Sequence, residues 1–172
     1  MHIPIRQKAA YLGILLAFSL ILGYLESLIP ISFGIPGIKL GLSNLPILLC
    51  LCLFDNLDGL ILCIVKSVLI CCLFGNAASF LYSISGAFLA CISMIIFLKI
   101  KEIHIPVVSA CGAVFHNIGQ LFTAGIIIGF RIIPYYLPVL IVSGLIMGLI
   151  TGFLAFILLK PVKKIIFKGD LS

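Results

Sequence analysis

Charged side chains within long apolar segments are the first candidates for chemistry in this 172-residue chain. Glu26 and Lys39 flank the stretch ISFGIPG, whose glycines and prolines suit a lid, and Lys66 lies in the middle of CIVKSVL. Ionisable groups at membrane depth are costly, so they are usually paired or face a water-filled cavity. Lys39 and Arg131 lie near segment ends, where a snorkelling side chain is the simpler interpretation. For Lys66 we expect either a ligand or a structural pair with Glu26.

A second polar group lies in the segment FHNIGQL. His116 and Gln120 are i,i+4 neighbours on a helix and Asn117 and Gln120 are i,i+3 neighbours, so the spacing predicts one polar stripe. Hydrogen bonds between helices and a ligand cavity are both compatible with this stripe. The amides of Asn44, beside a proline at an expected kink, and Asn76 complete the candidate binding residues. No acid or second nucleophile lies near His116 in sequence, so the pattern does not favour a catalytic assembly.

The composition predicts an integral membrane protein. Hydrophobic residues make up 63% of the chain and charged residues only 9%, whereas a soluble domain averages about 25% charged residues. The seven cysteines all lie in apolar segments without the spacing of a metal site, so we expect neither a metal nor a cofactor. Apolar runs near the ~20 residues that a crossing helix needs predict one all-α domain over 1–172, with six transmembrane helices at about 9–28, 38–54, 59–75, 77–98, 107–130 and 137–159.

The distribution of basic residues predicts the orientation of this six-helix bundle. Cytoplasmic loops are enriched in Lys and Arg, and six crossings place both termini on the same side. That side carries most of the basic residues, namely Arg6, Lys8, Lys99, Lys101, Lys160, Lys163, Lys164 and Lys168, against Lys39 and Arg131 on the other side. We therefore expect cytoplasmic termini, with 30–37, 75–76 and 131–136 facing outward.

Small residues recur every four positions in two of the predicted helices. Such faces allow two helix backbones to approach closely. In the last helix, where the repeat is Gly144, Gly148 and Gly152, we expect internal packing. In the first helix the repeat lies near the cytoplasmic end, where a partner could dock on Ala9, Gly13 and Ala17.

Four segments carry a resemblance to a known family, namely YLESLIP, GIPGIKLGLSN, FLYSISGAFL and VFHNIGQL. Together they resemble the small bacterial membrane proteins called the Gx transporter family, which is also labelled heptaprenyl diphosphate synthase component I. That family is similar to the S components of energy-coupling factor (ECF) transporters. The resemblance implies an S-component-like bundle of six helices in the bacterial cytoplasmic membrane, with a transmembrane coupling subunit and ATPase subunits as partners.

The family label and this likeness imply two different functions. The likeness implies a substrate-binding subunit of an importer for a small solute, and the surplus of positive charge favours an anionic one. The label implies a membrane subunit in polyprenyl diphosphate or quinone metabolism. Prenyl diphosphate synthases hold magnesium and diphosphate with aspartate-rich DDxxD motifs, whereas this chain has only DNLD at 55–58. We therefore expect the chain to be non-catalytic and favour the importer subunit.

Overall fold

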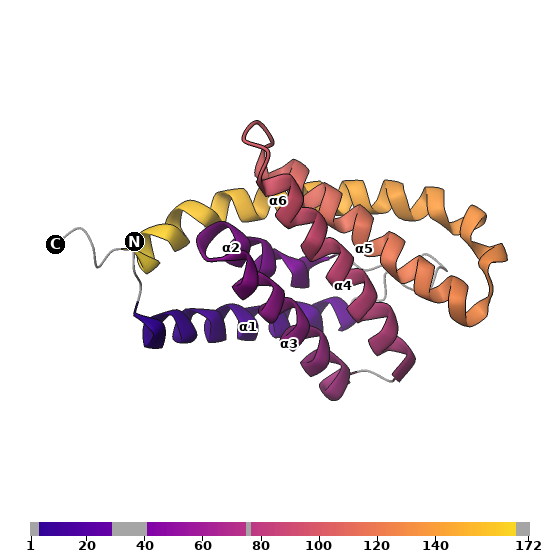
Figure 1. Ribbon diagram of the computed structural model, residues 1–172, viewed down its shortest axis with the longest axis horizontal. Helices are drawn as coiled ribbons and strands as arrows, with labels where there is room; N and C mark the ends of the chain where they lie inside the picture. Colours follow the sequence, from indigo (N-terminus) through magenta and orange to yellow (C-terminus); the bar gives the residue numbers. More distant parts are fainter. Residues whose placement is uncertain (1–3, 29–40, 75–76, 168–172) are drawn as a thin grey trace.

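Helices make up nearly all of the described part of the chain. The computed structural model describes residues 4–28, 41–74 and 77–167, and no strand occurs among them. Six α-helices and two short 3₁₀ turns (η1 and η2) follow one another in this part of the chain (Figure 1). Their bounds are α1 Ile5–Leu28, η1 Leu42–Asn44, α2 Leu45–Leu53, α3 Asn56–Phe74, α4 Ala77–Leu98, α5 Ile105–Ile128, η2 Phe130–Ile132 and α6 Ile133–Ile166.

Five of these helices, α1, α3, α4, α5 and α6, are long and apolar enough to cross a membrane. This confirms the prediction of an all-helical membrane bundle. The largest difference in bounds is at α6, which runs from Ile133 to Ile166 instead of 137–159. Hydropathy ends the predicted span where lysines begin, but lysine is a good helix former, so the helix continues past the apolar run.

The second predicted crossing, at 38–54, is not one long helix. Gly41 has a φ of +76°, in the left-handed region that glycine adopts readily, and a 3₁₀ turn separates it from α2. The helix α2 has nine residues, which corresponds to about 13.5 Å against the ~30 Å of a hydrocarbon core. Positions 38–40 lie outside the described residues. The described part therefore contains five membrane-length helices and one short helix, rather than six of similar length.

The short helix α2 occupies the centre of the hydrophobic core. Every residue from Leu45 to Leu51 is buried, and the helix packs against α1, α3, α4 and α6. A helix that is apolar on all sides is stable away from water, in a protein core or in lipid. In α2 the four neighbouring helices provide this environment.

The helices α5 and α6 form a close antiparallel pair. A Cβ atom added to Gly148 would lie 2.5 Å from the Cα of Ala110, and one added to Gly152 would lie 2.6 Å from the Cα of Pro106. Contacts this short require glycine, because real Cβ atoms do not approach backbone atoms so closely. The expectation that the glycine repeat of the last helix serves internal packing is confirmed.

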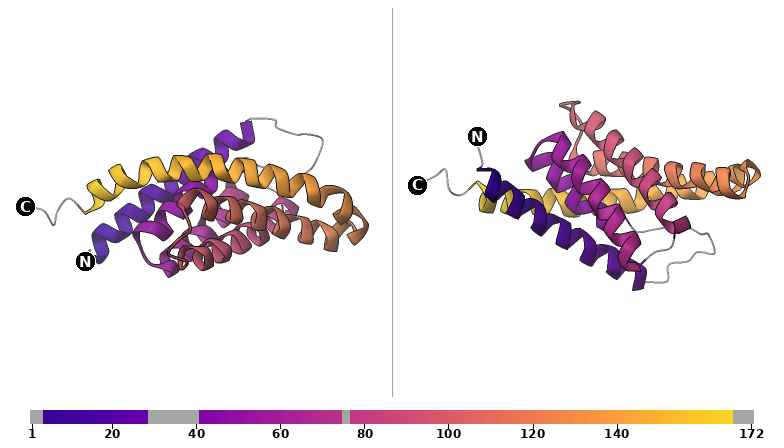
Figure 2. Two further views of the ribbon diagram at one scale, coloured as in Figure 1. Left: turned by 90° about the horizontal axis from the view of Figure 1, so that it is seen from above. Right: turned by 60° about the horizontal axis from the view of Figure 1, so that its bottom comes forward.

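Different chain segments lie at the two ends of the bundle. The start of α1 and the end of α6 lie at one end of the molecule, and the connection between α5 and α6 lies at the other (Figures 1 and 2). The first and the last described helices therefore begin and end at the same end of the molecule.

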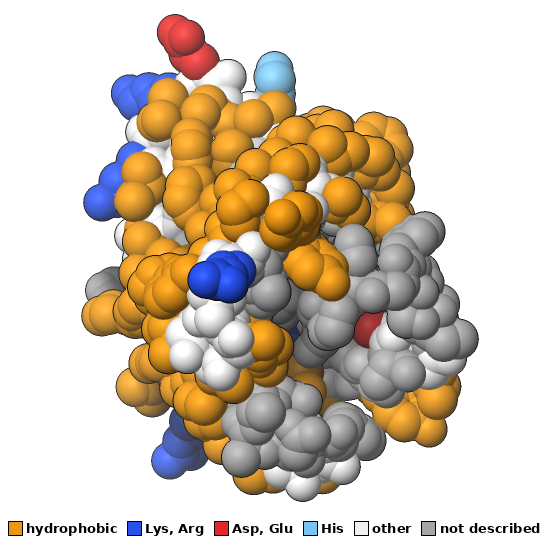
Figure 3. All heavy atoms as spheres, turned by 90° about the vertical axis from the view of Figure 1, so that its right-hand side faces the viewer, with side chains coloured by type: hydrophobic (Ala, Val, Ile, Leu, Met, Phe, Trp, Pro, Cys, Tyr) orange, Lys and Arg blue, Asp and Glu red, His pale blue; other side chains and the backbone are white. Residues whose placement is uncertain are grey.

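The outside of the bundle is hydrophobic. Large apolar side chains such as Ile126, Phe153 and Phe156 are more than half exposed. Among the described residues in the end-on view, hydrophobic side chains predominate and charged ones are few (Figure 3). Exposed apolar surface of this extent is stable in contact with lipid tails rather than water. Together with the five long apolar helices, it identifies a multi-pass membrane protein.

Candidate functional site

A turn between α1 and α2 gathers three of the predicted site residues. The Glu26 carboxylate, near the end of α1, accepts hydrogen bonds from the backbone N–H groups of Leu42 (3.0 Å) and Ser43 (3.3 Å). From α3, the Lys66 ammonium donates to the Ser43 hydroxyl (3.1 Å) and to Asn44 Oδ1 (2.7 Å). Two opposite charges from two helices therefore bind the same short turn, which we call the 41–44 turn.

The role of Asn44 follows from its position at the start of α2. An asparagine at this place usually accepts a hydrogen bond from a backbone N–H of the first helical turn. Asn44 makes no such cap, because its side-chain oxygen accepts from Lys66 instead. The neighbouring Pro46 lies in the first turn of α2, where proline is tolerated because no backbone donor is lost. The expected proline kink inside a long helix is therefore wrong, since the helix begins here.

Sequence reasoning missed Ser19 and Ser43, which are both buried in this cluster. The Ser19 hydroxyl, on α1, donates to the backbone carbonyl of Ser43 at 2.5 Å. The backbone N–H, the carbonyl and the hydroxyl of Ser43 thus all have partners from other helices. The position of Ser43 beside Asn44 in an apolar segment was the only sequence feature that could have indicated its role. Serine is common in membrane helices, so this feature was not specific.

The Lys66 ammonium lies deep in the protein, since only 2% of the residue is exposed. It donates to two side-chain oxygens, and its 2.7 Å contact to Asn44 Oδ1 has the length of a charge-assisted hydrogen bond. A buried ammonium with polar neighbours can neutralise an anionic group that enters the same region, because attraction is strong where water is excluded. Chemically, the cluster offers a buried positive charge and the Ser43 hydroxyl, which lies 3.1 Å from the Lys66 nitrogen.

The predicted stripe on α5 is divided between two helix interfaces. The Gln120 side-chain nitrogen lies 2.9 Å from Nε2 of His116, and both side chains pack against Gly86 of α4. Asn117 instead donates to the carbonyl of Leu140 on α6 at 2.8 Å. Successive residues on a helix are about 100° apart around its axis. Asn117, one residue after His116, therefore faces α6 instead of α4. The expectation of a single stripe is wrong, and the i,i+4 pair of His116 and Gln120 is confirmed.

The contact between Asn117 and α6 depends on a glycine. A Cβ at Gly144 would lie 2.9 Å from the Asn117 side-chain nitrogen. The absence of that Cβ gives the amide access to the Leu140 carbonyl. Asn117 therefore joins α5 to α6 by an interhelical hydrogen bond, which is one of the two roles that its sequence position suggested.

Two of the candidate binding residues, Lys39 and Asn76, lie outside the described residues. The candidate docking face on α1 is described in full. Ala9, Gly13 and Ala17 are all exposed, and a Cβ at Gly13 would meet no atom within 4 Å. Within the described part of the chain, these three residues therefore lie on the surface of α1, with open space at Gly13.

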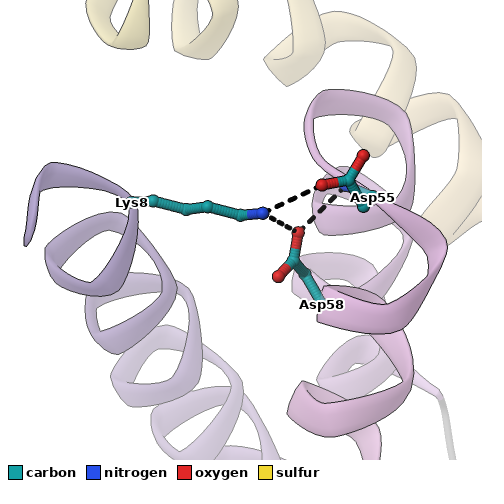
Figure 4. Close-up of polar contacts among 3 residues, drawn as sticks. All are labelled: Lys8, Asp55 and Asp58. Carbon is teal, nitrogen blue, oxygen red and sulfur yellow. Dashed lines mark hydrogen bonds and ion pairs between the residues drawn. The ribbon is translucent and has the colours of Figure 1, made fainter. Parts of the chain in front are cut away.

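The acidic pair in DNLD forms an ion-pair cluster with α1. The Lys8 ammonium lies 2.9 Å from Asp55 Oδ2 and 2.7 Å from Asp58 Oδ2 (Figure 4). Asp58 Oδ2 also accepts from the backbone N–H of Asp55 (3.0 Å), as the third residue of a helix does in a capping box. Both aspartates thus fasten the start of α3 and hold it beside the start of α1.

Comparison with known proteins supports one assignment. No curated protein and no solved structure matches the chain. The family model described as heptaprenyl diphosphate synthase component I matches residues 15–158. The matched range includes the 41–44 turn, Glu26, Lys66 and the polar residues of α5. The chain therefore belongs to the heptaprenyl diphosphate synthase component I family.

Proposed function

We propose that this protein is the substrate-binding membrane subunit of an importer of the energy-coupling-factor type. It crosses the bacterial cytoplasmic membrane six times, with both termini in the cytoplasm, and takes up a small solute that carries an anionic group. The segment that contains 41–53 makes the second crossing, with the short helix α2 as its described part.

The observation that carries this proposal is the cluster at the 41–44 turn. The Lys66 residue, which is only 2% exposed in the middle of α3, is bound through its ammonium to side-chain oxygens of a turn that follows the expected lid. Ionisable side chains inside membrane segments mark solute pathways more often than packing, because burial of a charge is costly. The positive charge of Lys66 and the surplus of basic residues in the chain favour an anionic solute.

Ligands that co-purify with the protein provide the test. The protein is purified in detergent and its bound ligands are released by denaturation. Mass spectrometry of the released material is expected to detect a small anionic solute. The variant Lys66→Met is expected to fold and to lose that solute, because a contact to a buried charge contributes a few kcal/mol, about a hundredfold in affinity. The control is Lys99→Met, in the exposed turn between α4 and α5. Unchanged solute content in Lys66→Met would contradict the proposed site.

The exposed face of α1 supports a second element of the proposal, the docking of a transmembrane coupling subunit. Ala9, Gly13 and Ala17 offer close backbone approach to a helix of that subunit, and the ATPase subunits would bind through it. Gly13→Leu is expected to abolish co-purification with coupling subunits and transport, while the binding of solute to the isolated subunit persists. Gly13→Ala is the matched control, since one methyl has open space there. Loss of folding in Gly13→Leu would contradict docking at this face.

The family description favours a second candidate function, a non-catalytic membrane subunit in polyprenyl diphosphate or quinone metabolism. In that case the bundle would hold an apolar chain or act as a scaffold for a synthase. The same mass spectrometry separates the two functions, because a prenyl chain in place of a small solute would support the second candidate.

A further inference from the structure

The end of α6 extends beyond the length that a membrane crossing requires. The helix has 34 residues, about 51 Å at 1.5 Å per residue, whereas the hydrocarbon core is about 30 Å thick. The apolar run that ends at Leu159 is followed by Lys160, Lys163 and Lys164 in the same continuous helix. We call these three lysines the basic end of α6.

The length of this extension matches the depth of the lipid headgroup layer. Headgroups add about 5–7 Å to each side of the hydrocarbon core. Along the helix axis, Lys163 and Lys164 lie about 4.5 Å and 6 Å beyond Lys160. With Leu159 at the edge of the hydrocarbon, all three ammonium groups are at the level of lipid phosphates.

The three lysines share one side of the helix and are free to bind an anion. Their spacing is i, i+3 and i+4, which places them on one face. All three are exposed, and the ion pairs found among residues 4–28, 41–74 and 77–167 involve Lys8 rather than any of them. By contrast, the Lys8 charge at the same end of the molecule is already neutralised by two aspartates.

Apolar side chains lie directly below this face in the direction of the membrane centre. Phe153, Phe156 and Ile157 are 57%, 56% and 53% exposed, one to two turns before the lysines. A phosphate bound by ammonium groups above, with acyl chains against exposed rings below, is the pattern of an anionic phospholipid.

We propose that the basic end of α6 is a binding site for the headgroups of anionic phospholipids. The charge of the three lysines, their depth and the apolar surface beneath them together select such a lipid over a zwitterionic one. This site is independent of the proposed solute site and does not require the importer function.

Native mass spectrometry tests the proposal on the full chain in nanodiscs that contain equal amounts of phosphatidylglycerol and phosphatidylcholine. The wild type is expected to retain phosphatidylglycerol in preference. The triple variant Lys160→Gln, Lys163→Gln, Lys164→Gln is expected to lower the ratio of retained phosphatidylglycerol to phosphatidylcholine by at least about fivefold, since each lysine near an anionic surface contributes about this factor.

Two control variants separate lipid binding from other effects of the lysines. Replacement of the three lysines by arginine keeps the charge and is expected to keep the preference. The variant Lys99→Gln, Lys101→Gln removes exposed basic residues from the turn between α4 and α5 and is expected to change the ratio less than the triple variant.

Three outcomes would overturn the proposal. The first is an unchanged lipid ratio in the glutamine variant. The second is an equal loss of thermal stability in phosphatidylglycerol and phosphatidylcholine, which would assign the lysines to the helix end alone, where basic side chains complement the helix dipole. The third is loss of a co-purifying membrane protein with the lipid ratio unchanged, which would assign the face to that protein.

Discussion

Ser43 shows how a chain can turn inside a membrane protein without unsatisfied polar groups. Its N–H donates to Glu26, its carbonyl accepts from Ser19 and its hydroxyl accepts from Lys66. Backbone groups without partners cost several kcal/mol each in an environment without water, so irregular backbone is tolerated only where protein or water satisfies it. Glu26 and Lys66, the charged residues that bind the 41–44 turn, therefore have a structural role in addition to any contact with a solute.

Substitution of Glu26 tests this structural role. Glu26→Ala removes the acceptors of two backbone N–H groups and is expected to lower the free energy of unfolding by about 1–3 kcal/mol, because both donors lose their partner. Glu26→Gln keeps one acceptor oxygen and is expected to lose less. Thermal unfolding in detergent, followed by circular dichroism, measures the difference.

The control for this series is Glu102→Ala, which removes an exposed acid from the turn between α4 and α5. Its unfolding midpoint is expected to equal that of the wild type. Equal midpoints for Glu26→Ala and Glu102→Ala would show that the carboxylate does not hold the turn.

At the residue scale, the sequence predicted the polar members of the cluster at the 41–44 turn, because polar and charged side chains are energetically costly inside a membrane. A glutamate, a lysine and an asparagine within apolar runs require partners, and Glu26, Asn44 and Lys66 do share one turn. The serines that complete the cluster carried no such signal, because a serine in a helix can also bond to its own backbone. The division of the α5 residues between α4 and α6 depends on which helices flank α5, which local spacing does not contain.

At the element scale, hydropathy located the long helices but not the character of the second crossing. An apolar run has the same composition whether it spans the bilayer or lies buried in the protein centre. Gly41 has a positive φ directly before η1 and α2, and only the packing of four neighbours on α2 shows that it is a core helix. The glycine repeats raise a similar ambiguity, since identical spacing serves internal packing in α6 and an open face in α1.

Alanine substitutions at one glycine from each repeat distinguish these two uses. Gly148→Ala places a Cβ 2.5 Å from the Cα of Ala110, so α5 and α6 must separate, and overpacking of this kind typically costs about 1–3 kcal/mol. Gly13→Ala meets no atom within 4 Å and is expected to be neutral or slightly stabilising, because alanine favours the helix. Unfolding midpoints of the two variants in the same detergent provide the comparison, and a Gly148→Ala protein as stable as Gly13→Ala would contradict the close packing.

At the scale of the whole molecule, the ion pairs of Lys8 and several exposed basic residues lie at the same end of the bundle. Lys8 binds Asp55 and Asp58, which places the connection between α2 and α3 beside the start of α1. The end of α6 lies at this end as well (Figure 2). The basic residues Arg6, Lys160, Lys163 and Lys164 therefore gather at one end, where the sequence alone predicted a common side.

The orientation of this end in the membrane is open to a direct test. Because Lys and Arg are enriched on the cytoplasmic side, a cysteine at Lys101, between α4 and α5, is expected to react with a membrane-impermeant maleimide only after the cells are opened. A cysteine at Tyr135, which is 80% exposed near the start of α6, is expected to react in intact cells.

Both cysteines are introduced into a background in which the native cysteines are replaced by serine or alanine. That background without an added cysteine is the control for unspecific labelling. Labelling of the Lys101 position in intact cells would reverse the orientation. Labelling of both positions in intact cells would place the two connections on the same side, and α5 would then not cross the membrane.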